Sequence, residues 1–162
     1  DIELICSILN NHSDKTLVIV GLISLKDEIL EKLESYNNIL FISPKPIEAL
    51  PAYLCYSDCA IIPFKINELT NSIYPLKINE YLAMGIPVVS TKFSEDIIQF
   101  SEVISLANNK NDFCQHIDFE IIEDNEQKQV KRKEAAKNNT WKKRVEQFWK
   151  TTIDQLKDST NA

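Results

Sequence analysis

Short apolar runs alternate with amphipathic stretches along most of the chain. The runs Thr16–Val20, Ile39–Ile42 and Ala60–Ile62 are rich in β-branched residues and have the length of buried strands. Between them, as in Leu25–Tyr36, apolar residues recur at helical spacing among charged ones. Because parallel strands are joined by crossover helices, this alternation predicts an α/β domain in which helices flank a parallel sheet.

The same patterns place the remaining elements. A strand is expected at Val88–Val89, a last strand at 103–106 and a short helix within 93–100. Further helices are expected at 1–11, 47–56, 75–84, 110–119, 124–137 and 141–156. The 162 residues suffice for one domain, 1–162, in which 124–158 forms the C-terminal helices.

The stretch Ser57–Thr91 is the one around which we expect the fold to be organised. The strand Ala60–Ile62 is followed by a polar loop, by a helix that starts at Pro75 and by a turn at Gly85, after which the next strand begins. Ligands of open parallel sheets bind beyond the carboxyl ends of the strands. This rule places Phe64–Tyr74 over a crevice.

The start of this helix has the features of an anion site. Its first turn carries unpaired N–H groups and a partial positive charge, to which Lys77 adds a full one, and this suits a diphosphate. Glu80 lies one turn further on, where a carboxylate can accept hydrogen bonds from a ribose diol.

Four short motifs in this stretch are similar to a known family. They are Pro75-Leu76-Lys77, Glu80-Tyr81-Leu82-Ala83, Gly85 and Pro87-Val88-Val89-Ser90-Thr91. They resemble the donor-binding segment of retaining GT-B glycosyltransferases of group 1, often called family 4. In that family the segment belongs to the C-terminal, Rossmann-like half. The family also has an earlier glutamate that touches the sugar, and Ser72 stands at that position here.

The resemblance implies roles for the residues at the helix start. Glu80 is expected on the ribose of a nucleotide-sugar donor, and Lys77 with the backbone of Tyr74 and Leu76 on the diphosphate. Neither a metal nor another cofactor is expected, since no pair of carboxylates suits a divalent cation. No catalytic residue is assigned, because acceptor-side groups in the family come largely from the other half.

Two loops are expected to complete the donor site. Thr70, Asn71 and Ser72 are placed near the phosphates or the transferred sugar. Ser43 and Lys45 match the family's loop that cradles the nucleotide base. For this second loop the alternative is a simple helix entry, with a proline in the first helical turn.

The two C-terminal helices differ in character. Asp124–Lys137 is almost wholly polar, which predicts a solvated helix, with an anionic membrane surface as the alternative contact. Trp141–Leu156 carries an apolar stripe with two tryptophans, which must pack against something. Its start resembles the closing helix of GT-B enzymes, which crosses back toward the N-terminal half. Trp141 and Arg144 are therefore expected to be structural.

Charge and composition exclude other classes of function. The net charge is -6 and the pI about 5.0, without the positive field of a nucleic-acid binder. Cys6, Cys55, Cys59 and Cys114 lack the spacing of a zinc site and are expected to be buried and reduced. No apolar run reaches the roughly 18 residues of a membrane span, and no secretory leader opens the chain. We therefore expect a cytoplasmic protein, at the inner face of the membrane if it contacts one.

The resemblance implies transfer of a sugar from a nucleotide-diphosphate sugar to an acceptor, in bacterial surface polysaccharide or glycoconjugate synthesis. GT-B enzymes build their active site between two halves. The N-terminal acceptor domain and the strand that usually opens the donor half are not in this sequence. The chain is therefore expected to be a fragment of a longer protein, inactive by itself. Two alternatives stay open: a GT-B nucleotide-sugar epimerase, and a non-catalytic Rossmann-like regulatory or interaction domain.

Overall fold

Helices and parallel strands alternate along the chain, as the hydrophobic pattern predicts. The computed structural model describes residues 1–160, with side chains as far as 154. The elements in order are α1 (Ile2–Asn11), β1 (Leu17–Val20), α2 (Asp27–Glu34), β2 (Ile39–Ile42), a 3-10 turn η1 (Ile47–Ala49), α3 (Leu50–Leu54), β3 (Ala60–Ile62), α4 (Glu68–Asn71), α5 (Leu76–Met84), β4 (Val88–Thr91), α6 (Glu95–Ile98), β5 (Ser105–Ala107), α7 (Lys110–Ile122), α8 (Glu126–Asn138) and α9 (Trp141–Thr160).

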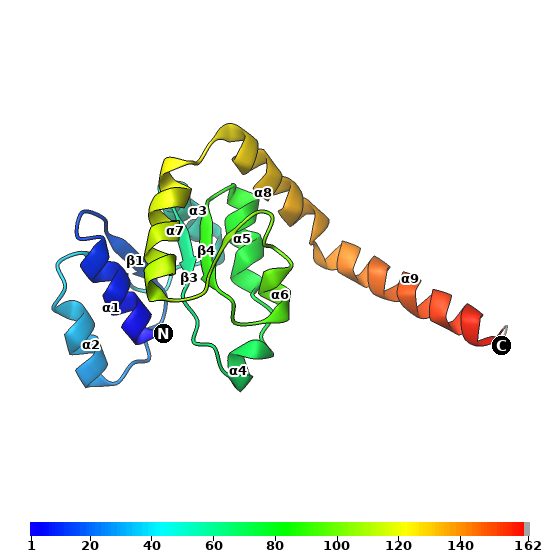
Figure 1. Cartoon of the computed structure of the whole chain (residues 1–162), viewed down its shortest axis with the longest axis horizontal. Coiled ribbons are helices and arrows are strands. Elements are labelled where there is room, and N and C mark those ends of the chain that lie inside the picture. Colours follow the sequence, from blue (N-terminus) through cyan, green and yellow to red (C-terminus); the bar gives the residue numbers. More distant parts are fainter. Residues whose placement is uncertain (161–162) are drawn as a thin grey trace.

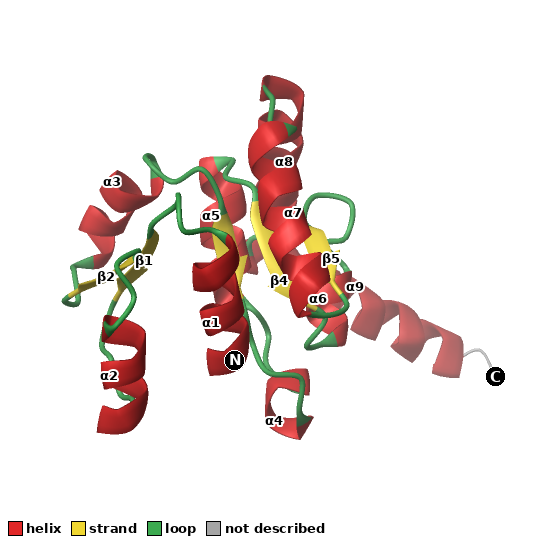
Figure 2. Ribbon diagram, turned by 60° about the vertical axis from the view of Figure 1, so that its left-hand side comes forward, coloured by secondary structure: helices red, strands yellow, loops and turns green. Residues whose placement is uncertain are grey.

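The described strands pair in two parallel sheets. β1 lies beside β2, with Leu17 opposite Ile39. The other sheet has the order β3-β4-β5, with Ala60 opposite Val88. The parallel α/β class is confirmed. The strands were expected in one sheet, but β1 and β3 do not pair with each other, so the strands form two separate sheets (Figure 2).

Helices cover both faces of the β3-β4-β5 sheet (Figure 1). Successive residues of a strand point to opposite faces, and both Val88 and Val89 of β4 are 0% exposed. Val88 packs in a cluster with residues of α5, α6 and α8, whereas Val89 packs with residues of α1 and α7. The sheet that carries the central βαβ unit is therefore buried on both sides, which explains its unbroken apolar runs.

Gly85 ends α5 as the sequence predicts. Its φ is 78°, in the left-handed region, and its N–H donates to Leu82 O at 2.9 Å. The next N–H, of Ile86, donates to Tyr81 O at 3.1 Å, which completes the hydrogen-bond pattern of a glycine helix stop.

Several boundaries differ from the prediction, among them α2, which is shorter than Leu25–Tyr36, and α7, which extends beyond 119. Two further differences have a local cause. The loop after β3 contains the one-turn helix α4, which Asn67 caps by accepting the N–H of Thr70. The last strand is Ser105–Ala107 instead of 103–106, because the N–H groups of Val103 and Ile104 both donate to Phe100 O in a turn. In both places a local hydrogen bond overrides the apolar pattern.

Helix α8 is solvated on one side, as its composition predicts, but its other side is packed. Arg132 is only 2% exposed and Ala136 is 9% exposed, both on the side that packs against α5.

Helix α9 extends away from the rest of the molecule (Figure 1). Its apolar stripe, expected to be packed, is left open within the described residues, with Trp141 and Trp149 72% and 58% exposed. The side chain of Leu156 lies outside the described part.

The four cysteines are free thiols in different surroundings. Cys6 and Cys114 are buried as expected, and Cys59 is partly buried. Cys55 is exposed, so the prediction of burial is wrong for it, because the short helix α3 turns this residue outward. Burial, followed by the charge of Glu120, raises the pKa of the Cys59 thiol to about 12.

Candidate functional site

The first turn of α5 offers an unpaired backbone donor. The Leu76 N–H donates to Tyr74 O at 2.9 Å and the Ile78 N–H to Pro75 O at 3.0 Å. Among the described residues the N–H of Lys77 has no acceptor. The helix start therefore keeps the donor and the partial charge that an anion can use.

Glu80 lies one turn into α5 and is only partly covered. Its side chain is 40% exposed, and Oε2 accepts a hydrogen bond of 3.0 Å from Lys77 Nζ. This contact leaves Oε1 for another donor. Burial, and after it the neighbouring Glu80 carboxylate, raise the pKa of Tyr81, so its phenol stays neutral near pH 7.

A cavity of about 700 Å³ runs along α5 and brings three predicted residues together. Tyr74, Leu76 and Glu80 all line it. The remaining lining comes from α5, α8, the α8–α9 junction and the start of α9, through Asn79, Ala83, Lys133, Ala136, Lys137, Asn139, Thr140, Trp141 and Arg144.

Tyr74 connects the start of α5 to the opposite wall. The Asn79 side-chain amide donates to Tyr74 Oη at 3.1 Å, and Asn139 Nδ2 donates to Asn79 Oδ1 at 2.7 Å. The guanidinium of Arg144 lies 4.0 Å from the centre of the Tyr74 ring, a cation–π contact. Arg144 thus packs on Tyr74 and also forms part of the cavity wall, and its purely structural role stays a prediction.

The wall opposite α5 is cationic. Lys133, Lys137 and Arg144 line the cavity, against the single carboxylate of Glu80. Sequence reasoning missed the two lysines because it assigned their helix to solvent. The available signal was spacing, since Lys133 and Lys137 lie at i and i+4, on one face of the helix.

The residues predicted in the loop before α5 are not brought to this cavity. Thr70, Asn71 and Ser72 lie in or beside α4, which projects away from the helices that form the cavity (Figures 1 and 2). Thr70 Oγ1 donates to Lys65 O at 2.5 Å, and Ser72 Oγ donates to Glu68 O at 3.2 Å. Their hydroxyl donors are thus engaged with backbone carbonyls. A role on the donor stays a prediction for all three.

Ser43 and Lys45 lie apart from the other candidates. They follow β2, the outer strand of the other sheet, and do not line the cavity beside α5. A contact with a nucleotide base stays a prediction for this loop.

The described part of the chain has neither a cluster of metal-ligating side chains nor a membrane-spanning helix. Among the side chains that the structure describes, as far as residue 154, no three from His, Cys, Asp or Glu gather closely enough to hold a metal ion, and metal-independent chemistry stays a prediction. None of the helices in the same range combines the length and apolar composition that a membrane crossing requires.

Comparison with known proteins assigns the chain to a family. Residues 2–121 match the sequence profile of the family described as "Glycosyl transferases group 1". A curated protein of Bacillus subtilis (strain 168), provisionally named the teichuronic acid biosynthesis glycosyltransferase TuaH, is 32% identical over 65 residues. That match covers 40% of this chain and 16% of TuaH.

The fold has a solved relative. The crystal structure of WaaG, a glycosyltransferase involved in lipopolysaccharide biosynthesis, superimposes with a TM-score of 0.57 at 15% sequence identity. The superposition covers 83% of this chain and 36% of WaaG, so the chain spans only part of the length of either relative. Since the family profile extends over most of the sequence, the chain belongs to the group 1 glycosyltransferases and has their GT-B, Rossmann-like fold.

Proposed function

We propose that this chain binds the nucleotide-sugar donor in a glycosyltransferase that moves the sugar to an acceptor. One observation carries the proposal. The half-exposed Glu80 lines a cavity of about 700 Å³, one turn into a helix whose first turn has an unpaired N–H, and the opposite wall carries three cations. A carboxylate beside a cationic surface suits a ligand that joins a diol to a diphosphate.

Each group has a part in this proposal. Glu80 Oε1 accepts hydrogen bonds from the ribose hydroxyls, while Lys77 holds the carboxylate through Oε2. The helix N-terminus, Lys133 and Lys137 attract the diphosphate and stabilise the negative charge that develops on it as the glycosidic bond breaks. Transfer with retention of the anomeric configuration and without a metal belongs to the same proposal.

The setting of the reaction is inferred from the relatives. TuaH and WaaG are named for teichuronic acid and lipopolysaccharide biosynthesis, so the acceptor is proposed to be a growing surface polysaccharide or glycoconjugate. The acceptor-binding domain is proposed to lie outside this chain, and the reaction to take place in the cytoplasm at the membrane. The chain by itself is proposed to be inactive.

The experiment measures nucleotide binding by calorimetry in the complete natural polypeptide, with uridine, guanosine and adenosine diphosphates as probes. Glu80→Gln removes one charged hydrogen-bond acceptor, a loss of about 1.5 to 3 kcal/mol. The affinity of the best probe is therefore expected to fall about tenfold or more. Glu126→Gln, on an exposed residue at the start of α8, is the matched control and should leave the affinity unchanged.

Two results would contradict the proposal. Equal affinities of the Glu80→Gln and Glu126→Gln variants would remove Glu80 from the site. Absence of binding and of thermal stabilisation with all three diphosphates would favour the non-catalytic interaction domain. Interconversion of a nucleotide sugar without an acceptor would identify an epimerase instead.

A further inference from the structure

Arg132 is the only lysine or arginine of the described part whose side chain is buried, at 2% exposed. Its three nitrogens reach three different partners. Nε donates to Gly85 O at the end of α5 at 2.9 Å, Nη2 contacts Asp124 in the α7–α8 connection, and Nη1 lies 3.7 Å from Glu120 Oε2 of α7. One side chain of α8 is therefore tied to α5, to α7 and to the loop between α7 and α8.

Stability alone is a weak reason to bury this arginine. Taking a guanidinium and its carboxylate partners out of water is costly, and apolar side chains of similar volume are often as stabilising or more so. Glu120 is 7% exposed and accepts a hydrogen bond of 2.6 Å from Ser105 Oγ, so the cluster also contains a buried carboxylate. What such a cluster provides and an apolar contact does not is direction, because each bond fixes the relative position of its two partners.

Helix α8 has little else to fix its position on α5. The buried residues of α8 are Arg132 and Ala136, whereas Val130 is 48% exposed. Two packed helices are held in place by side chains that interlock. The methyl group of Ala136 offers little to interlock, so it does not prevent α8 from sliding or turning. The bonds of Arg132 therefore set the register of α8 on α5.

This register decides where the lysines of α8 lie. Lys133 follows Arg132, and a Cβ built on Gly85 would lie 2.7 Å from Lys133 Cε, so the stem of this lysine runs over the bare Cα of the glycine. Lys137 lies one turn further along the same face. Both lysines line the cavity that Glu80 also lines, and Arg132 does not. Any effect of the arginine on a ligand therefore passes through the wall that it positions.

We propose that Arg132 is a positioning residue of the candidate site, which holds the ammonium groups of Lys133 and Lys137 in the cavity. Its three attachments set the register of α8 on α5, and this register directs both lysines toward the ligand. The identity of that ligand, a nucleotide diphosphate, rests on the function proposed above. The guanidinium stays behind the cavity wall and does not touch the ligand.

Two substitutions together remove the attachment without leaving a buried charge. Arg132→Met alone would leave Glu120 buried without its cation, which is strongly destabilising. Arg132→Met combined with Glu120→Met, here called the Met pair, replaces both ions by flexible apolar side chains. Asp124 is partly exposed and keeps the hydrogen bond of 2.9 Å from Gln129 Nε2. The Met pair is therefore expected to keep most of the stability of the unmodified chain while losing the register of α8.

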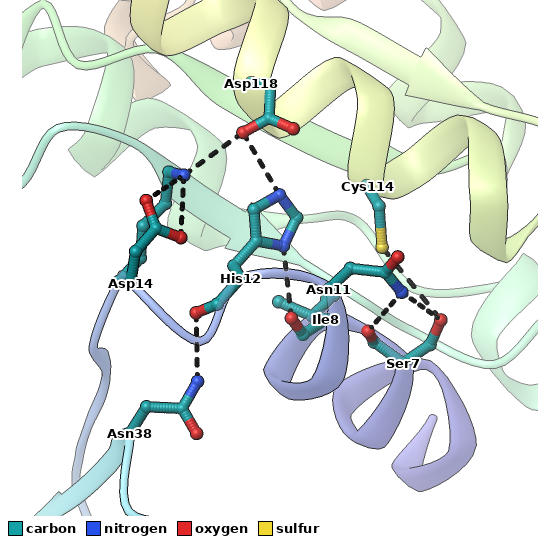
Figure 3. A network of polar contacts seen from close by, with 9 residues as sticks. Ser7, Ile8, Asn11, His12, Asp14, Asn38, Cys114 and Asp118 are labelled. Carbon is teal, nitrogen blue, oxygen red and sulfur yellow. Dashed lines mark hydrogen bonds and ion pairs between the residues drawn. The ribbon is translucent and has the colours of Figure 1, made fainter.

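Figure 3 shows a second polar network, which supplies a control. Asp118 Oδ1 of α7 lies 3.3 Å from His12 Nε2 and 3.2 Å from Lys15 Nζ, so it also joins two segments through ion pairs. His12 and Lys15 border a groove of about 830 Å³ between β1 and β3, and none of the three residues lines the cavity beside α5. Asp118→Asn weakens this network and should leave diphosphate binding unchanged.

Calorimetry on the complete natural polypeptide measures the effect, with the best-bound of uridine, guanosine and adenosine diphosphate as the probe. Replacing Lys133 and Lys137 together by alanine is expected to lower the affinity about tenfold or more, because charged hydrogen bonds are lost. The Met pair should lower it by a similar factor and also reduce its dependence on ionic strength, because fewer cations face the ligand. In a chain that already lacks both lysines, the Met pair should change the affinity by less than about twofold.

A second measurement needs no ligand. Gly85→Ala and Lys133→Ala are expected to be coupled in urea denaturation, because the added methyl group meets the stem of the lysine only while the register holds. In the Met pair this coupling should disappear. The positioning of Lys133 is thus tested even if none of the three diphosphates binds.

Several results would overturn the proposal. Full affinity in the Met pair, with affinity lost on removal of the two lysines, would leave the proposed function standing and exclude Arg132 from it. Additive losses from the Met pair and the lysine substitutions would show that the arginine acts by another route, and an equal loss in Asp118→Asn would assign the effect to general destabilisation. Coupling of Gly85→Ala and Lys133→Ala that persists in the Met pair would show that α8 keeps its register without the arginine. Unchanged affinity after removal of both lysines would contradict their part in the proposed function, whatever the coupling shows.

Discussion

Gly85 is the residue with the sharpest steric constraint near the site. Its φ of 78° is one that side chains with a Cβ rarely adopt, and a Cβ built there would lie 2.7 Å from Lys133 Cε. The same residue accepts a hydrogen bond of 2.9 Å on its carbonyl from Arg132 Nε. Gly85 thus ends α5, leaves room for a side chain of α8 and accepts a hydrogen bond from a buried arginine.

Replacing Gly85 by alanine is expected to lower the free energy of unfolding by about 1 to 3 kcal/mol. The left-handed backbone contributes roughly 1 to 2 kcal/mol, and displacement of the Lys133 side chain contributes the rest. Urea denaturation of the single variants and of the Gly85→Ala, Lys133→Ala double variant separates the two parts. When Lys133 is already alanine, the Gly85→Ala substitution should lower the free energy of unfolding only by the backbone part, because no Lys133 side chain has to be displaced. If the loss stays the same, contact with Lys133 is not a cause of it.

The carboxylate of Asp124 is coupled to the buried Arg132. The guanidinium contacts Asp124 through Nη2 and lies 3.7 Å from Glu120 through Nη1. Burial acts to raise the pKa of Asp124, but the hydrogen bonds from Gln129 and Arg132 outweigh it, and the pKa is lowered from 3.8. A carboxyl group with a lowered folded-state pKa stabilises the fold above its unfolded value and loses that contribution as the pH falls through the folded value.

The stability contributed by Asp124 should therefore vanish in acid. At pH 7, Asp124→Asn is expected to cost about 1.5 to 3 kcal/mol, the range for hydrogen bonds to charged groups. Below pH 3.8 the difference from the unmodified chain should shrink toward zero. Urea denaturation between pH 7 and pH 2 measures it, with Asp154→Asn on an exposed part of α9 as the control. A constant difference across this range would show that the ion pair does not cause the loss.

At the scale of elements, α5 and α8 form the most extensive helix pair of the described structure. Their contact combines Ala136 with the buried Arg132 instead of a broad apolar stripe. Sequence reasoning therefore predicted the helix α8 and missed its packing, since an arginine is normally counted as exposed. The strands were predicted more closely, with Ile39–Ile42 and Ala60–Ile62 matching β2 and β3, because buried parallel strands are continuous apolar runs.

For the whole molecule, α9 is the element that lacks a partner. Both tryptophans of the chain lie on it, 72% and 58% exposed, and the helix extends beyond the domain (Figure 1). Large aromatic side chains are costly to leave in water. We therefore still expect the apolar stripe of α9 to pack, against a surface outside the described residues.

Tryptophan fluorescence provides the test for α9. In the chain starting at Asp1, Trp141→Phe and Trp149→Phe variants should each retain a single red-shifted emission that acrylamide quenches freely, because the remaining indole is in water. In the complete natural polypeptide the emission of at least one indole should move to shorter wavelength as the helix is covered. Blue-shifted, shielded emission in the shorter chain would show that α9 folds back onto the domain.

The candidate site was predictable only in part. Glu80, Tyr74 and Leu76 were found because a local signal, a proline at the start of a helix followed by a glutamate one turn later, sets their relative positions. Lys133, Lys137 and Arg144 are more than 50 residues away from Glu80 in sequence. They reach the cavity through the packing of α8 on α5, which a polar composition does not reveal.

The sequence by itself determined the alternation of helices and strands, the parallel α/β class and the helix that presents Glu80. These follow from local periodicity and from backbone rules at proline and glycine, which act over a few residues. Tertiary structure decided the division into two sheets, the burial of Arg132, the cationic wall and the groove between β1 and β3. These four features depend on which distant segments pack together and on the volume that the packing leaves open. No single stretch of the chain specifies either of them.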